Sequence, residues 1–132
     1  MLDKINLSQF SGAENYYRFN ALFPNFVLTD GTRYVAKNGG DGGAYWLFEA
    51  IASHWPIVKK NPLCKDFQLW ELKVDLTKKS AILSCKADSN TQPVIIQPIP
   101  YTDFDLDYIK FYVKPIPLGE ELGNVIMLPS EY

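Results

Sequence analysis

The sequence contains few of the side chains that most often carry chemistry. It has one histidine, His54, and two cysteines, Cys64 and Cys85, among its 132 residues. The cysteines form no C-x-x-C pair and have no histidine near them, so their spacing predicts neither a zinc site nor a disulfide framework. Because free cysteines are among the most buried residue types, we expect two buried thiols.

Long apolar runs and a strong excess of charge are also missing. No stretch approaches ~18 uninterrupted apolar residues, and the first residues, MLDKINLSQFSG, lack the basic and apolar segments of a secretory signal. We therefore expect a cytoplasmic protein that does not bind a membrane. The formal net charge of −2 gives no general attraction to polyanions, so nucleic acid would need a local basic patch. We rank single-stranded nucleic acid last among the candidate ligands.

The glycine-rich segment KNGGDGG, from Lys37 to Gly43, lacks a phosphate-binding motif. That motif requires G-x-x-x-x-G-K-[ST], whereas Gly43 is followed by Ala44 and Tyr45. Asp41 also places a negative charge near the start of the next predicted helix, where it would repel a phosphate. We interpret the segment as a flexible turn in which Asp41 caps the helix or complements its dipole.

Apolar and aromatic side chains are plentiful, at 47% and 14% of the chain. A chain of this length buries enough surface for one core without disulfides or metals, so we expect one globular domain over residues 1–132. The aromatic share fits either a dense core or an adhesive surface.

The clearest predicted helix spans Ala44–Trp55, which contains no helix breaker and is followed by Pro56. A second helix is predicted within Tyr101–Val113. There, Thr102 and Asp105 have the spacing of an N-cap pair, and Leu106, Ile109, Tyr112 and Val113 recur at the helical period. Ser11 and Glu14 have the same capping spacing and predict a short first helix over the residues NYYRF.

The clearest predicted strand is Trp70–Leu76, in which apolar and polar side chains alternate strictly. Ser80–Ala87 and Pro93–Tyr101 continue it as an antiparallel meander, with prolines that suggest an edge. Val125–Leu128 could add a last strand beside the meander. Residues 26–36 fit two structures: Asp30-Gly31 is a hairpin turn, or Thr29 caps a helical turn, and we favour the hairpin.

Together these elements predict an α+β fold. Its mostly antiparallel sheet of about four to five strands carries two or three helices on one face.

Catalytic and metal sites are not predicted. His54 lies on the apolar side of its helix near the C-terminal end, where an imidazole can satisfy terminal carbonyls. Asp103, Asp105 and Asp107 lack the glycine bend and distal glutamate of a Ca²⁺ loop, and we assign at least two of the three to helix capping and a favourable interaction with the helix dipole. We predict no cofactor.

Several residue motifs in the chain together carry a resemblance. These are LSQFSGAENYYRF, TDGTRYVA, GGAYWLFEAIASHW, FQLWELKV, YTDFDLDYIKFYV and the terminal LPSEY. They resemble a family of short uncharacterised bacterial proteins, a domain of unknown function that also occurs on plasmids and phages. The resemblance covers nearly the whole chain, implies a single intact domain, and implies no reaction, cofactor or catalytic residue.

Our leading hypothesis is a non-enzymatic interaction or regulatory protein that binds another protein or itself. Because Tyr and Arg are enriched at interfaces, the contact candidates are Tyr16, Tyr17, Arg18 and Tyr132. The alternative is an enzyme or small-molecule-binding domain with a pocket beside the 44–55 helix and His54, Glu49 and Asp41 as polar contacts. Lysines near Phe67 and Trp70 resemble a single-strand-binding surface, but the strand pattern predicts that Trp70 is buried.

Overall fold

The computed structural model describes residues 2–12 and 15–132. The strands are β1 (Tyr17–Arg18), β2 (Phe26–Leu28), β3 (Gln68–Asp75), β4 (Ser80–Lys86), β5 (Ile95–Ile99), β6 (Tyr108–Leu118) and β7 (Glu121–Met127). The helices are α1 (Lys4–Ser8), α2 (Asp30–Asn38), α3 (Tyr45–Ser53), the single turn α4 (Trp55–Val58) and the 3₁₀ helix η1 (Pro129–Glu131). None of these helices is long and apolar enough to cross a lipid bilayer.

The strands of the described residues form one open sheet in the order β1-β2-β7-β6-β3-β4-β5. All neighbours are antiparallel except β2 and β7, which pair in parallel. The α+β class and the β3-β4-β5 meander are confirmed. The predicted number of strands is too low, because the sheet has seven. The last strand adds to β6 and β2, so β6 separates it from the meander.

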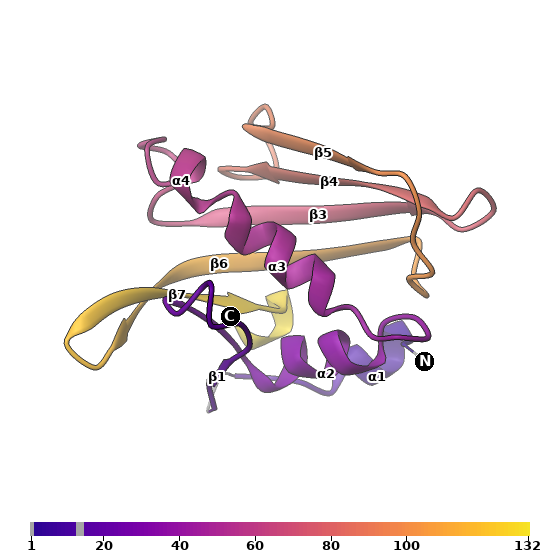
Figure 1. Cartoon of the computed structure of the whole chain (residues 1–132), viewed down its shortest axis with the longest axis horizontal. Helices are drawn as coiled ribbons and strands as arrows, with labels where there is room; N and C mark the ends of the chain where they lie inside the picture. Colours follow the sequence, from indigo (N-terminus) through magenta and orange to yellow (C-terminus); the bar gives the residue numbers. More distant parts are fainter. Residues whose placement is uncertain (1, 13–14) are drawn as a thin grey trace.

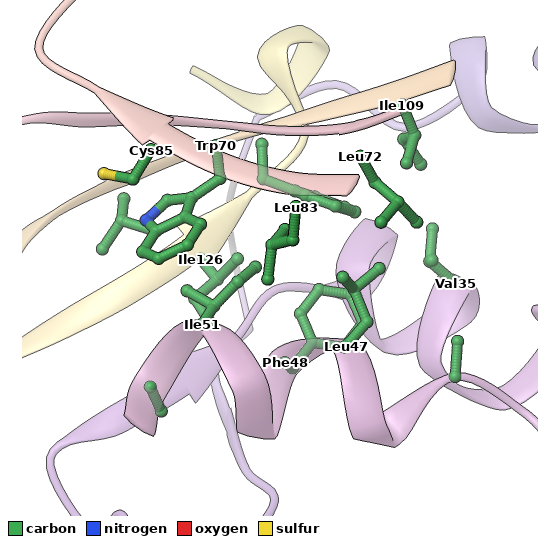
Figure 2. Packing of buried hydrophobic residues seen from close by; sticks show 14 of the residues in the cluster. Val35, Leu47, Phe48, Ile51, Trp70, Leu72, Leu83, Cys85, Ile109 and Ile126 are labelled. Atoms are coloured by element: carbon green, nitrogen blue, oxygen red, sulfur yellow. The ribbon is translucent and has the colours of Figure 1, made fainter. Parts of the chain in front are cut away.

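One face of the sheet carries the main core, and a small second cluster around Val27, Val125 and Met127 lies on the other face. Figure 1 shows α3 and α4 crossing the face of the main core, with α2 beside the end of the sheet formed by β2 and β7. Trp70 and Leu72 of β3 point toward Leu47, Phe48 and Ile51 of α3 (Figure 2). All five side chains are almost completely buried. Burial of apolar surface of this kind is the main contribution to the stability of a small domain.

The predicted helix over Ala44–Trp55 is confirmed as α3, with a difference at each end. Ala44 is the N-cap and no side chain caps the helix, so Asp41 is not its cap. Pro56 does not end the helical path either, because the chain turns at His54 and enters α4 with the proline in its first turn. Proline is tolerated there because the first helical N–H groups have no partner within the helix.

The predicted helix within Tyr101–Val113 is wrong, since Tyr108–Leu118 form β6. Ile109, Phe111 and Val113 are buried, and the intervening side chains are partly exposed, which is the alternation of a strand. The Thr102 hydroxyl does accept a hydrogen bond from the Phe104 N–H at 3.2 Å, but it closes a local turn.

The hairpin favoured for residues 26–36 is also wrong, and the alternative is confirmed. Thr29 caps α2, with its hydroxyl accepting from the Thr32 N–H. The carboxylate of Glu131 completes this helix start: it accepts from the Thr29 hydroxyl at 2.6 Å and from the Gly31 and Leu128 N–H groups at 3.0 Å each. A carboxylate at a helix N-terminus also complements the dipole.

The first predicted helix, over the residues NYYRF, is replaced by a strand where the structure describes it. Tyr17 and Arg18 form β1, which pairs with β2. Glu14, the predicted partner of Ser11 in the capping box, lies outside the described residues.

Candidate functional site

The face of the sheet opposite α3 is the candidate functional site, and we call it the open face. Its residues follow from the strand register, because side chains that alternate with the core residues point to the other side. On β3 to β6 they include Leu69, Glu71, Lys73 and Asp75 of β3, Ile82, Ser84 and Lys86 of β4, Ile96 and Pro98 of β5, and Tyr108, Lys110, Tyr112 and Lys114 of β6. On β2 and β7 the same side of the sheet carries Val27, Val125 and Met127, which form a small buried cluster with Tyr112, Ile116 and Leu118.

The open face is richer in positive charge than the whole chain. It carries four lysines (Lys73, Lys86, Lys110 and Lys114) against two carboxylates (Glu71 and Asp75), although the chain has a net charge of −2. Within the described residues, only Lys86 of these lysines forms an ion pair. A local excess of positive charge attracts anionic groups even when the whole molecule is acidic.

A hydrogen-bonded ion pair lies at the centre of this face. Lys86 Nζ lies 2.8 Å from Glu71 Oε1, and the Tyr108 hydroxyl donates to Glu71 Oε2 at 2.5 Å. Burial alone would raise the pKa of Glu71, but the bonds from Lys86 and Tyr108 outweigh it and lower the pKa. The pKa of Tyr108 is raised by burial and by the neighbouring Glu71. Glu71 is therefore ionised and Tyr108 neutral at physiological pH.

An aromatic cluster borders the ion pair. The rings of Phe67, Tyr112 and Tyr132 lie 5.1–5.5 Å apart in tilted and edge-on arrangements. Lys114 Nζ lies 5.2 Å from the centre of the Tyr132 ring, within cation–π distance. Tyr132 is 67% exposed, so this cluster presents an aromatic surface beside a positive charge.

Apolar side chains continue the open face toward the sheet edge. Ile82 is 50% and Ile96 is 64% exposed, and their strands, β4 and β5, are neighbours. Exposed aliphatic side chains beside aromatic and cationic ones are typical of protein interfaces, where apolar anchors are surrounded by a polar rim.

The structure separates the interaction candidates into two regions. Tyr132 lies on the open face, whereas Tyr17 and Arg18 lie on β1 at the opposite end of the sheet order from β5. Tyr17 donates to Asp30 at 2.7 Å and stacks under the Arg33 guanidinium at 4.2 Å. Its pKa is raised, first by the hydrogen bond to Asp30. Arg18 donates to the Pro24 carbonyl at 3.2 Å, and the neighbouring Tyr16 is exposed.

Of the three residues of the predicted pocket, only Glu49 lies within α3, and each of the three has a different partner. His54 lies at the end of the helix, where Nε2 is 2.6 Å from Gln97 Oε1 and the ring stacks on Trp70. Its ring therefore contacts side chains in place of the terminal carbonyls expected from the sequence. Glu49 accepts from Asn20 at 2.5 Å. Asp41 precedes α3, and its main-chain N–H donates to Asp103 at 2.9 Å.

The three alternating aspartates bind different partners. Asp103 accepts from the Asp41 N–H, Asp105 accepts from the Leu2 N–H at 2.8 Å, and Asp107 lies 3.9 Å from Lys4. They organise loops and do not cap a helix, so the sequence assignment was wrong in this respect. In the part of the chain that the structure describes, no three histidine, cysteine or acidic side chains are placed to hold a metal ion.

The two cysteines are free and fully buried, as expected. Although 21 positions separate Cys64 from Cys85, their thiols are close enough to interact. Burial is the main reason why the pKa of each thiol is raised. Raised values disfavour the reactive thiolate, so these residues are packing groups.

The central residues of the open face, Glu71, Lys86 and Tyr108, were missed from the sequence. They lie on three strands, and only the register of β3 with β4 and β6 brings them together. A local signal existed in the alternation of Tyr108, Lys110, Tyr112 and Lys114, which the helical interpretation of that segment concealed. The buried position predicted for Trp70 is confirmed.

Comparisons with known proteins identify a family of unknown function and no individual relative. No curated protein and no solved structure matches the chain. The model of a protein family described as a family of unknown function, DUF6876, matches residues 2–132. The chain therefore belongs to the DUF6876 family of unknown function.

Proposed function

We propose that this protein is a non-enzymatic, cytoplasmic binding protein that holds an acidic segment of a partner protein on its open face. The observation that carries the proposal is the gathering of lysines, aromatic rings and exposed aliphatic side chains on one sheet face, where no helix of the described part of the chain crosses β3 and β4. Because the motifs resemble a family that also occurs on plasmids and phages, we propose that the partner belongs to the host or to the mobile element.

Charge supplies the first part of the recognition. Lys110 and Lys114 project from one strand and Lys73 projects from the neighbouring strand, where acidic side chains of a partner would meet them. Complementary charge of this kind speeds encounter and fixes orientation more than it adds affinity. The Glu71–Lys86 pair satisfies its own charges, so a partner can cover it without leaving either ion unpaired.

Apolar contact supplies the affinity. Tyr132 with Tyr112 at one side of the face and Ile82 with Ile96 at the other provide surfaces that lose water when a partner docks. Tyrosine is enriched among the residues that dominate interface energies.

The proposal is tested by capture from a host lysate with matched charge variants. The double variant Lys110→Glu, Lys114→Glu replaces two of the four lysines of the face by carboxylates, and Lys59→Glu, Lys60→Glu makes the same change on exposed residues beside α4. We expect a partner that is captured by the wild type and by the α4 control, and lost with the open-face variant. Mass spectrometry of cross-linked peptides should place an acidic segment of the partner against β3 and β6.

Two results would contradict the proposal. The first is equal capture by both double variants. The second is salt-sensitive binding of a dT20 oligonucleotide that depends on Lys110 and Lys114, since the same lysines and rings would then serve a phosphate backbone and stacked bases.

A further inference from the structure

β6 extends past the strand beside it. Its register with β7 runs from Tyr112 to Leu118, and its register with β3 begins at Tyr108. Tyr108–Phe111 therefore have β3 on one side, and among the described residues no strand lies on the other side. Four residues of strand span about 13 Å. Although β6 lies between two strands in the sheet, this short stretch has one unpaired side, like the edge strand of a sheet.

The hydrogen-bond pattern shows which residues face this edge. The Val74 N–H donates to the Asp107 carbonyl at 2.8 Å. In an antiparallel pair, alternate residues bond to the same neighbour, so Ile109 and Phe111 bond to β3. The main-chain groups of Tyr108 and Lys110 point the other way. No hydrogen bond between described residues uses these groups.

A groove lies against this unpaired edge. Its volume is about 390 Å³, and it is bounded by α1, the start of β6 and η1. Leu7, Leu106, Leu128 and Pro129 give it apolar walls. Lys4 and Lys110 are its charged lining residues; Asp107, which does not line it, lies 3.9 Å from Lys4 in an exposed ion pair. An apolar hollow with positive groups beside it and unpaired main-chain groups along one wall has the chemistry to hold an extended acidic peptide.

Building on the proposed function, we propose that the partner's acidic segment enters this groove and adds to β6 as a short strand. Its main chain pairs with Tyr108 and Lys110, and so continues beside β6 the strand position that β7 occupies as far as Met127. One apolar side chain of the segment fills the space between Leu106 and Leu128, and an acidic side chain meets Lys4 or Lys110. Strand addition of this kind takes its affinity from main-chain bonds and its specificity from side-chain pockets.

The experiment uses the full chain and a phage-displayed library of random 12-residue peptides. Peptides selected on the wild type are synthesised, and their binding is measured together with amide hydrogen exchange of the protein. In the free protein we expect Ile109 and Phe111 to exchange slowly and Tyr108 and Lys110 to exchange fast. The bound peptide should protect Tyr108 and Lys110, because their N–H groups become ladder donors.

Variants separate the groove from the rest of the open face. Ser130 lines the groove and is exposed, so Ser130→Trp fills it and should weaken peptide binding by at least about tenfold. Ser89→Trp adds the same bulk to an exposed turn and should leave binding unchanged. Lys110→Pro removes the donor, whereas Lys110→Gln removes the charge and keeps the N–H. We expect the proline to weaken binding more than the glutamine does.

Each remaining outcome overturns the inference. Failure to select peptides, or selection of peptides that bind the Ser130→Trp variant equally well, excludes the groove. Binding that leaves Tyr108 and Lys110 unprotected excludes strand addition. Peptides that bind independently of the groove but lose binding to the Lys114→Glu and Lys73→Glu variants would support the proposed function and exclude the groove. Failure of the groove proposal is therefore distinguishable from failure of the proposed function.

Discussion

The two faces of the same sheet differ in what their polar groups do. On the covered face, β3 contributes Trp70 and Leu72 to a core that α3 covers. The polar side chain of Gln68, on the same strand, accepts a hydrogen bond from the Trp70 indole N–H at 2.8 Å. On the open face, the same strand contributes Glu71 and Lys73. The polar group Gln68 supports packing on the first face, whereas on the second Glu71 is held in a largely buried ion pair and Lys73 is exposed, and no helix of the described residues crosses β3 there.

The residues of the two faces contribute differently to the stability of the fold. A core of buried aromatic and aliphatic side chains accounts for the covered face without reference to a partner. The excess of lysine and the exposed isoleucines on the open face contribute little to folding, because surface charges and singly exposed apolar groups have small effects on stability. Their grouping on one face is the basis of the binding role that we propose.

The largest effect is expected from truncation on the covered face. Trp70→Ala removes a fully buried ring that packs against α3 and stacks on His54, and it should lower the free energy of unfolding by about 3–5 kcal/mol. Lys73→Ala, on the same strand and the other face, should change it by less than about 0.5 kcal/mol. Urea denaturation measures both. Similar losses for the two variants would erase the distinction between the faces.

The next effect concerns the ion pair of the open face. Glu71→Gln leaves the Lys86 ammonium, which is 18% exposed, without its carboxylate and should cost about 2 kcal/mol of unfolding free energy. Replacing both residues, as Glu71→Gln with Lys86→Met, should recover most of this loss. A double variant as unstable as the sum of the single changes would show that the two side chains act separately.

The same pair predicts a pH dependence. Because the pKa of Glu71 is lowered in the folded protein, its stabilisation is present above the ordinary glutamate pKa of about 4.5 and is lost as pH falls through the lowered value. The stability difference between the wild type and Glu71→Gln should therefore shrink on acidification from neutral pH to about pH 3. Urea titrations across this range measure it. A constant difference would contradict the ionised, hydrogen-bonded state of Glu71.

A smaller effect is expected from the aromatic cluster. Tyr132→Ala removes one of three mutually packed rings and should lower the free energy of unfolding by about 1 kcal/mol. Tyr45→Ala, at an exposed position of α3, serves as the control. We expect only the Tyr132 variant to lose the captured partner as well. Retention of the partner by both variants would show that Tyr132 is not part of the interface.

The smallest effect on folding should come from the exposed isoleucines. Ile82→Ser with Ile96→Ser should change the free energy of unfolding by less than about 1 kcal/mol, because both side chains already meet water. Partner affinity should nevertheless fall by roughly tenfold, since the apolar area buried on docking is lost. Isothermal titration with the purified partner checks this. Unchanged affinity would show that the partner does not contact Ile82 and Ile96, and that the interface lies on β3 and β6 only.

The comparison of faces also explains which parts of the fold were predictable. Alternation in Trp70–Leu76 predicted a strand with two different faces, because the period of two is a local property. The helix of Ala44–Trp55 was also predictable from local features, namely a run without helix breakers that is followed by Pro56. The strand β6 was mistaken for a helix because Leu106, Ile109, Tyr112 and Val113 also fit a helical period. Pairing of β6 with β3 and β7 decides between the two patterns, and those neighbours lie far away in sequence.

Long-range contacts limited the remaining predictions in the same way. At the start of α2, the local cap of Thr29 and Thr32 is supported by Glu131, which lies 102 positions away from Thr29 and could not be paired with it from the sequence. On the open face, only Tyr132 could be named from residue type, because tyrosine is common at interfaces. The lysines of this face lie on three strands, and the register that assembles them is not encoded in any short segment.

The most direct test of the central claim is a map of amide chemical shifts on addition of the captured partner. We expect the changes to follow the open-face residues of β3, β4 and β6, including Lys73, Lys110 and Lys114, while the exposed side of α3 stays unaffected. Changes confined to α3 and α4, with the amides of β3 and β6 unmoved, would contradict the account.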